Sequence, residues 1–142
     1  MARLPEVVAD ASIVCKWYVH ESDSDIAVSL RDAHSKGQVR ILAPQLLPYE
    51  IANVLRFRPG ISPNDLRGIM RSFFDLQLAL APPTSASLRH ALDFAFREKL
   101  TIYDACYAVL AESHACPLVT ADTDLLRASN LAVRVSDWSN DS

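Results

Sequence analysis

Four acidic residues stand where carboxylates can do metal-dependent chemistry: Asp10, Glu50, Asp104 and Asp122. Asp10 and Asp122 each follow a short apolar stretch, residues 7–9 and 118–120, that predicts a strand. In an open parallel sheet, ligands bind beyond the carboxyl ends of the strands, where the strand order reverses. Because Asp is also a favoured N-cap at a strand-to-helix junction, capping explains either aspartate equally well when it is taken alone.

Glu50 and Asp104 lie on segments whose apolar periodicity predicts helices. Glu50 shares a face with Leu47 and Val54, where a carboxylate is costly unless it is paired or bound to metal. The alternative is that Glu50 marks the polar edge of that stripe and pairs with a basic residue. Asp104 follows Thr101 by three positions, a spacing that resembles a capping box, yet its other helical neighbours are apolar or small. Neither residue by itself distinguishes a functional role from a structural one.

Two acids at strand ends and two on inward helix faces can converge on one pocket. Carboxylates so placed repel, because a like-charged pair at ~4 Å costs about 4 kcal/mol even at an effective dielectric of ~20. A bound cation or retained protons must offset this repulsion. Oxygen ligands without His or Cys select hard cations, and Mg2+ or Mn2+ held by few carboxylates plus water commonly meets phosphate. The four residues therefore indicate phosphodiester hydrolysis.

The elements that must position these acids alternate along the chain. Short apolar runs predict strands at residues 5–9, 39–43, 78–81, 118–120 and 132–135. Helical spacing and capping residues predict helices at 11–19, 24–36, 45–56, 63–76, from 85 or 87 onward, 101–114 and 122–128. Ser62 is the expected N-cap before Pro63, and Gly37 the expected left-handed residue after the second helix. This alternation predicts an α/β fold with a mostly parallel sheet covered by helices on both faces.

Composition predicts one soluble domain over residues 1–142, without a linker. The chain is 50% hydrophobic and 22% charged, enough for one self-sufficient core. It has no apolar run of membrane-spanning length and no signal-peptide pattern at its start, so we expect a cytoplasmic protein that does not enter a membrane. The net charge of -3 disfavours nonspecific coating of nucleic acid, but it permits an enzyme that reaches phosphate through metal ions.

Other chemistries find little support in the sequence. Cys15, Cys106 and Cys116 lack C-x-x-C spacing, so we expect reduced thiols rather than disulfides or a zinc site. The sequence contains no G-x-S-x-G elbow, no phosphate-binding P-loop and no G-x-G-x-x-G. The four histidines form no H-E-x-x-H pair, and each is expected at the surface.

Four stretches of the chain resemble the PIN-domain family, specifically the VapC-type ribonuclease toxins of bacterial type II toxin-antitoxin pairs. They are V-V-A-D-A-S-I-V-C-K-W (7–17), P-Y-E-I-A-N-V-L (48–55), L-T-I-Y-D-A-C-Y-A-V-L-A (100–111) and L-V-T-A-D-T-D-L-L (118–126). The resemblance implies a three-layer α/β/α fold, Mg2+ or Mn2+ as cofactor, and endonucleolytic cleavage of RNA by a metal-activated water.

The resemblance also assigns roles to individual residues. Asp10 and Asp104 correspond to principal metal ligands, while Glu50 and Asp122 complete the acidic quartet directly or through water. Ser12 and Thr120 match supporting hydroxyls that orient a carboxylate or a metal-bound water. Asp124 matches a frequent extra acid, and the alternative is that it enriches the first turn of a helix with negative charge.

Partners follow from the same resemblance: an RNA substrate, a small antitoxin encoded beside the toxin, and a second copy of the chain in a homodimer. Trp17 and Tyr18 offer an apolar groove for the antitoxin, or else Trp17 packs in the core. Flanking phosphates have candidate ligands among basic side chains, with solvated surface charge as the alternative for each: Lys16, Arg56, Arg58, Arg67 and Arg71.

Three other functions compete with the ribonuclease. A phosphatase of the haloacid dehalogenase type needs a D-x-D pair after its first strand, whereas Asp10 is followed by Ala11 and Ser12. A receiver domain needs a phosphoacceptor Asp at the end of the middle strand, and residues 78–81 run into Pro82 instead. A PIN-like RNA-binding or interaction module without a toxin role is the third, and the intact quartet weighs against it.

Overall fold

A computed structural model describes residues 3–139 and contains a single parallel sheet. Its strands are β1 (Glu6–Ala9), β2 (Arg40–Pro44), β3 (Ala79–Ala81), β4 (Leu118–Val119) and β5 (Ala132–Val133). They lie in the order β3-β2-β1-β4-β5, and all four pairings are parallel. The predicted mostly parallel sheet is confirmed and is parallel throughout. The chain moves outward from β1 to β3 and then returns beside β1 as β4, so the strand order reverses between β1 and β4.

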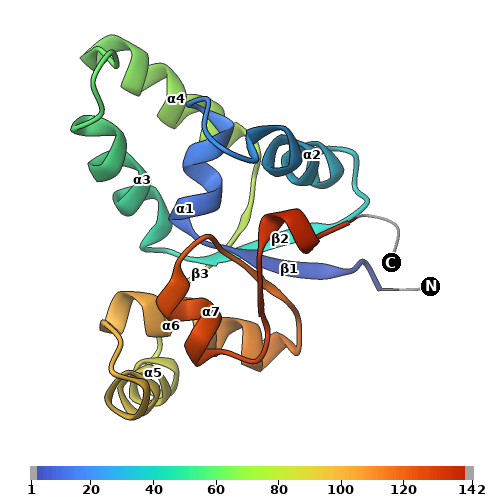
Figure 1. Ribbon diagram of the computed structural model, residues 1–142, viewed down its shortest axis with the longest axis vertical. Coiled ribbons are helices and arrows are strands. Elements are labelled where there is room, and N and C mark those ends of the chain that lie inside the picture. The colour runs from blue at the N-terminus through green and yellow to red at the C-terminus, as the bar shows by residue number, and fades with distance from the viewer. Residues whose placement is uncertain (1–2, 140–142) are drawn as a thin grey trace.

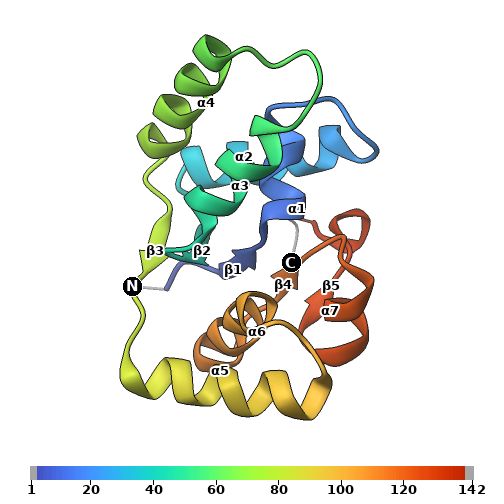
Figure 2. The same ribbon diagram turned by 90° about the vertical axis from the view of Figure 1, so that its left-hand side faces the viewer.

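Helices cover both faces of the sheet, which confirms the three-layer α/β/α architecture (Figures 1 and 2). One face carries α1 (Ala11–Val14), α2 (Ser24–Ser35), α3 (Leu47–Arg56) and α4 (Pro63–Asp75). The opposite face carries α5 (Ser85–Glu98), α6 (Ile102–His114) and α7 (Thr123–Ala128). Right-handed crossovers require this division, because the direction of travel across the sheet reverses after β3.

Local capping explains where several helices begin and end. Ser62 accepts the Asp65 N–H while the Asp65 carboxylate accepts the Ser62 N–H, and Pro63 occupies the first position of α4, as predicted. Gly37 follows α2 with a φ of 71°, the left-handed conformation expected for a residue after a helix. These signals act over three or four residues, so they can be read directly from the sequence.

Two predicted helices differ from the structure by two residues or more at one end. The helix expected over residues 11–19 ends as an α-helix at Val14 and continues as a 3-10 helix over Cys15–Trp17. The N–H groups of Tyr18 and Val19 both donate to the Cys15 carbonyl, and this tighter turn closes the segment. The helix expected from residue 45 begins at Leu47 instead, and the Gln45 N–H extends the β2–β3 pairing by donating to the Ala81 carbonyl.

The core lies on both faces of β1, whose residues Val7, Val8 and Ala9 are almost fully buried, as a central parallel strand requires. Trp17 is 7% exposed and its Nε1 donates to the Ala27 carbonyl at 2.8 Å, so Trp17 belongs to the core rather than to a docking groove. No helix within residues 3–139 is long and apolar enough to cross a membrane.

The three cysteines are free thiols, as predicted. Cys15 and Cys116 are buried and Cys106 is half-buried. Burial raises the thiol pKa of Cys15 to about 12 and that of Cys116 to about 11, so both remain protonated near neutral pH. These side chains therefore behave as small apolar groups.

Candidate active site

The ends of β1 and β4 bring Asp10 and Asp122 to the same edge of the sheet. Asp10 directly follows β1, Asp122 lies three residues beyond β4, and the two strands are parallel neighbours with Ala9 opposite Val119. This edge faces the viewer in Figure 2, with α1 and α3 above it and α6 and α7 below. The two aspartates therefore lie where the strand order reverses, the usual ligand position in such sheets.

Asp10 is buried, at 5% exposure, and both of its carboxylate oxygens accept hydrogen bonds. The Ser12 hydroxyl donates to Oδ1, the Thr120 hydroxyl donates to Oδ2, and the Ile13 N–H donates to Oδ1 at 3.3 Å. Burial raises the pKa of Asp10 to about 6, the three donors oppose that rise, and the charge of Asp122 adds to it. The acid that follows β1 therefore ionises at a higher pH than an ordinary aspartate.

The two hydroxyls also tie the end of β1 to the loop between β4 and α7. Thr120 is fully buried and its Oγ1 accepts the Asp122 N–H at 2.9 Å, while Ser12 Oγ accepts the Ala121 N–H at 3.0 Å. Because each oxygen accepts a backbone N–H, its own proton is directed to Asp10. These contacts orient a carboxylate, one of the two roles that the sequence suggested for Ser12 and Thr120.

Asp122 caps α7 as well as facing the other acids. Its Oδ1 accepts the Asp124 N–H at 2.8 Å and the Leu125 N–H at 3.2 Å. Asp10 likewise caps α1 through Ile13. Capping and a place in the acidic pocket are therefore compatible, because a cap engages one oxygen of the carboxylate. Asp124 is exposed, and its charge raises the pKa of Asp104.

Asp104 and Glu50 approach from opposite layers of the fold. Asp104 lies in the first turn of α6, where its N–H donates to the Thr101 hydroxyl at 3.1 Å. Both hydrogen bonds of a capping box are present at α4 and at α5. At α6 the bond from the Asp104 N–H to the Thr101 side chain is the one of the two that is formed. Burial raises the pKa of Asp104, the Asp122 charge raises it further, and the Thr101 hydroxyl opposes both.

Glu50 lies in the first turn of α3 and is half-buried. The Tyr107 hydroxyl donates to its Oε1 at 2.6 Å. Burial raises the pKa of Glu50, the Tyr107 hydrogen bond opposes the rise, and the charges of Asp104 and Asp10 add to it. Its partner is thus a phenol rather than the basic residue considered from the sequence.

The charges of the four acids affect one another in a closed set. The charge of Asp122 raises the pKa of Asp10 and of Asp104, and the charges of Asp10 and Asp104 raise the pKa of Glu50. We call this set the acidic ring. Within residues 3–139, no three His, Cys, Asp or Glu side chains are grouped closely enough to form a ready-made metal cage. The donors of this set are all oxygens, the ligand type that Mg2+ prefers, and Mg2+ commonly binds through one or two carboxylates and keeps several waters.

Two of the candidate phosphate ligands are engaged within the protein. Lys16 is 9% exposed, donates to the Ser22 carbonyl at 2.8 Å and pairs with Glu21 at 3.4 Å. Arg58 pairs with the same Glu21 at 2.8 Å. Lys16 is therefore neither a solvated surface charge nor free to meet a phosphate in this arrangement.

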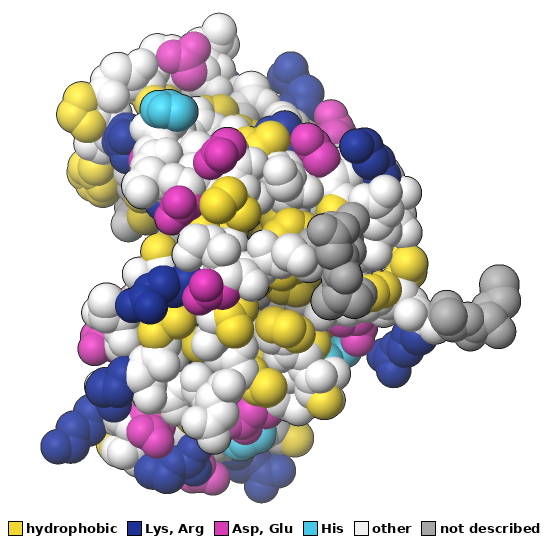
Figure 3. Space-filling model, turned by 45° about the vertical axis from the view of Figure 1, so that its right-hand side comes forward, with side chains coloured by type: hydrophobic (Ala, Val, Ile, Leu, Met, Phe, Trp, Pro, Cys, Tyr) yellow, Lys and Arg dark blue, Asp and Glu magenta, His cyan; other side chains and the backbone are white. Residues whose placement is uncertain are grey.

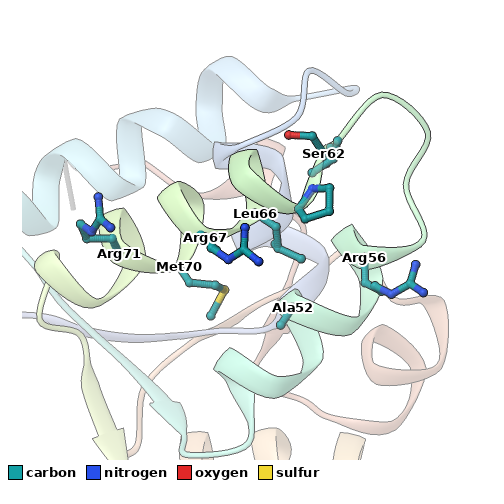
Figure 4. Close-up of a pocket in the computed structure, with 9 residues that line it drawn as sticks. Ala52, Arg56, Ser62, Leu66, Arg67, Met70 and Arg71 are labelled. Atoms are coloured by element: carbon teal, nitrogen blue, oxygen red, sulfur yellow. The ribbon is translucent and has the colours of Figure 1, made fainter.

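The other three candidates, Arg56, Arg67 and Arg71, line one cleft between α3 and α4 (Figure 4). The cleft has a volume of about 830 Å³, and Leu66 and Met70 contribute to its apolar floor. Elsewhere, on the face shown in Figure 3, basic and acidic side chains are interspersed. The α3–α4 cleft thus combines an apolar lining with three arginines, which Figure 4 shows spaced along it.

Tyr107 is the residue of this site that sequence reasoning missed as a polar group. In the sequence it lies one helical turn from Asp104, on a face of apolar and small residues. The signal that points to it is a phenol on a buried helix face, because a buried Tyr hydroxyl usually finds a hydrogen-bond partner. The identity of that partner, Glu50, depends on the packing of two distant helices.

Comparison with known proteins places this geometry in context. Residues 7–131 match the model of a family described as PIN domain. No curated protein sequence matches the chain. Among solved structures, PAE2754 from Pyrobaculum aerophilum is 26% identical with a TM-score of 0.66, covering 93% of this chain and 90% of that one.

Two further structures share the fold at lower identity. VapC20 from Mycobacterium tuberculosis, described as a sarcin-ricin loop cleaving toxin, is 12% identical with a TM-score of 0.69, covering 86% of this chain and 94% of that one. FitAB bound to an IR36 DNA fragment is 14% identical with a TM-score of 0.70, covering 96% of this chain and 99% of that one.

Proposed function

The chain belongs to the PIN-domain family, and we propose that it is an endoribonuclease dependent on Mg2+ or Mn2+, the toxin of a VapBC-type pair. The observation that carries this proposal is the acidic ring at the point where the strand order reverses. Carboxylates at that position, without a basic partner among their described contacts, suit a divalent cation that meets the phosphodiester of RNA.

Each acid has a role in the proposal. Asp10 and Asp104 are the principal ligands, and Glu50 and Asp122 complete the site directly or through water. When bound, the cation neutralises the scissile phosphate and activates the attacking water. The protein keeps the acids oriented: the hydroxyls of Ser12 and Thr120 hold both oxygens of Asp10. Asp124 adds negative charge beside Asp104.

The raised pKa values support a requirement for a cation. Burial and the neighbouring acids raise the pKa of Asp10, Glu50 and Asp104. Near neutral pH, full ionisation of the ring therefore costs free energy that a divalent cation recovers on binding. Metal affinity should accordingly rise with pH as the ring loses its protons.

A small antitoxin is the partner we propose, and the α3–α4 cleft suits one of its segments. The arginines and apolar side chains that line it complement a segment that carries both acidic and apolar residues. VapC20, which shares the fold, is itself described as a toxin. The Trp17 groove suggested by the sequence finds no such support, because Trp17 is buried.

We also propose that the chain is a cytoplasmic homodimer built from one ribonuclease domain over residues 1–142. Leu88, Leu92 and Phe96 form an exposed apolar stripe on α5, at 40%, 45% and 83% exposure. A stripe of this kind on a helix supports contact with a second copy. The described residues share one sheet and one buried cluster, which supports a single domain.

The deciding experiment is incubation of the purified chain with total cellular RNA, with and without Mg2+ or Mn2+, followed by mapping of fragment ends. We expect cleavage at defined sites that requires the cation and is lost when Asp104 is replaced by Asn. RNA that is bound but remains intact under all metal conditions would favour the interaction module over the enzyme. Cleavage that persists in EDTA would contradict the proposed metal dependence.

A further inference from the structure

Tyr107 joins the two helical layers at the acidic ring. It lies on α6, one turn after Asp104, and is 1% exposed. Its hydroxyl donates at 2.6 Å to Glu50 Oε1 on α3, and α3 and α6 cover opposite faces of the sheet (Figure 2). A single side chain thus spans from the helix that carries Asp104 to the acid on the opposite layer.

The phenol is suited to hold a carboxylate without cancelling its charge. Its hydroxyl is buried and donates its proton to Glu50 Oε1 at 2.6 Å, so it acts as a neutral donor. A Lys or Arg in this place would neutralise Glu50 and compete with a cation. Ser12 and Thr120 hold Asp10 with neutral hydroxyls in the same way.

We propose that Tyr107 is the positioning residue for Glu50. By fixing Oε1 it sets the orientation of the carboxylate and leaves Oε2 for the cation or for a water between them. Tyr107 also fixes the spacing between Glu50 and Asp104, because Tyr107 and Asp104 lie on the same helix. The inference rests on the proposed function, since it assigns Tyr107 a role only if the acidic ring binds a divalent cation.

The Tyr107→Phe variant tests the inference, because it removes one buried hydroxyl and keeps the ring. We expect the Mn2+ dissociation constant of the purified chain to rise by about tenfold to a hundredfold, the range for losing a partner that orients a metal ligand. The matched control is Tyr103→Phe on the same helix, whose side chain is 60% exposed, and it should leave the dissociation constant unchanged. Calorimetric titration with Mn2+ measures both without RNA.

A double-mutant cycle with Glu50→Gln separates positioning from a general structural role. If Tyr107 acts through Glu50, then Tyr107→Phe should not weaken Mn2+ binding further in the Glu50→Gln background. Equal losses in both backgrounds, or unchanged affinity in Tyr107→Phe alone, would overturn the proposal. If the wild-type chain bound no Mn2+ at all, the proposed function itself would fail, which is a different result.

Proton NMR on the wild-type chain gives a second measurement that does not depend on the folding of a variant. The buried Tyr107 hydroxyl should give a slowly exchanging downfield resonance, because its proton is held in a short bond to a carboxylate. Saturation with Mg2+ should shift this resonance if Glu50 lies at the cation. A resonance that does not respond to Mg2+, in a chain that binds the ion, would contradict the assignment.

Discussion

Carboxylates lie at both ends of β1, Glu6 at its first residue and Asp10 directly after its last, and the two acids have opposite surroundings. Glu6, the first residue of the strand, has a side chain that is 7% exposed and contacts Arg3 at 3.3 Å, Arg40 at 3.1 Å and His114 at 3.2 Å. Asp10, directly after the strand, is 5% exposed and accepts only neutral donors among its described hydrogen bonds. The acid at one edge of the sheet thus has basic partners, whereas the acid at the opposite edge has neutral hydrogen-bond donors.

The pKa values reflect both burial and partners, because the Asp10 carboxyl is more deeply buried than that of Glu6 and has no basic partner among its described contacts. Burial alone would raise the pKa of Glu6, but the His114 hydrogen bond and the charges of Arg3, His114 and Arg40 lower it below its ordinary value. At Asp10, burial prevails and the pKa rises to about 6. An acid whose charge is met by the protein's own cations serves the fold, while an acid left among other acids is available to a ligand.

The largest expected difference between the two edges is in RNA cleavage. Asp10→Asn removes a proposed metal ligand, so we expect cleavage to fall by at least about a hundredfold, the upper end of losses from residues that merely support a metal ligand. Glu6→Gln, at the opposite edge, should cut RNA at the wild-type rate. Initial rates on a mapped RNA site, with saturating Mn2+, measure both. Equal losses in the two variants would erase the functional contrast between the edges.

The pH dependence of stability should have opposite signs at the two edges. The folded-state pKa of Asp10 is raised from 3.8 to about 6, so its contribution is fully present below about 3.8 and is lost as pH rises through 6. Without metal, this loss is at most about 3 kcal/mol. The folded-state pKa of Glu6 is lowered from 4.5, so its contribution is present above 4.5 and is lost as pH falls.

Urea unfolding of metal-free protein between pH 3 and pH 7 checks these signs. The stability of Asp10→Asn relative to wild type should increase with rising pH, apart from a constant offset for the lost hydrogen-bond acceptor. The stability deficit of Glu6→Gln should shrink as pH falls. The same slope for both variants would show that the carboxylates at the two edges do not differ as described.

Stability at neutral pH gives a smaller contrast. Glu6→Gln keeps the shape but removes the charge that faces Arg3, Arg40 and His114, so the free energy of unfolding should fall by about 1 kcal/mol. The estimate is modest because the side chains of Arg3 and Arg40 are 80% and 52% exposed. Mn2+ affinity should be unaffected. A large loss of Mn2+ affinity with an unchanged melting temperature would mean that Glu6 affects cation binding at the acidic ring.

The fold was predictable because its determinants are local. Strands of apolar residues and caps such as Ser62, Thr101 and Asp122 act within three residues, and the structure places helices directly after them. Their alternation then leaves few topologies for a parallel sheet. The positions of Asp10 and Asp122 at one edge follow from the same reasoning, since parallel strands end on the same side.

The contacts that distinguish the two edges were not predictable, because they join residues far apart in the chain. Glu6 meets His114, and Glu50 meets Tyr107. His34 was expected at the surface, yet its Nδ1 accepts the Ile41 N–H at 3.1 Å and its Nε2 lies 2.9 Å from the Leu76 carbonyl. Periodicity shows which side of a helix is buried, but it does not show which residue from elsewhere in the chain will contact that side.

The smallest expected effect, the stability of Asp104→Asn without metal, sharpens the comparison most directly. The Thr101 cap uses the Asp104 N–H, which Asn retains, so replacing the carboxylate leaves that hydrogen bond in place. The change removes repulsion from Asp122, and the metal-free chain should be no less stable, with a gain of up to about 1 kcal/mol. A structural acid behaves oppositely, since loss of a cap costs about 0.5 to 2 kcal/mol. Thermal melts without metal, Mn2+ titration and RNA cleavage on this one variant separate the two cases. Should Asp104→Asn melt lower than wild type while cutting RNA at the wild-type rate, Asp104 would belong with Glu6 among the acids that serve the fold.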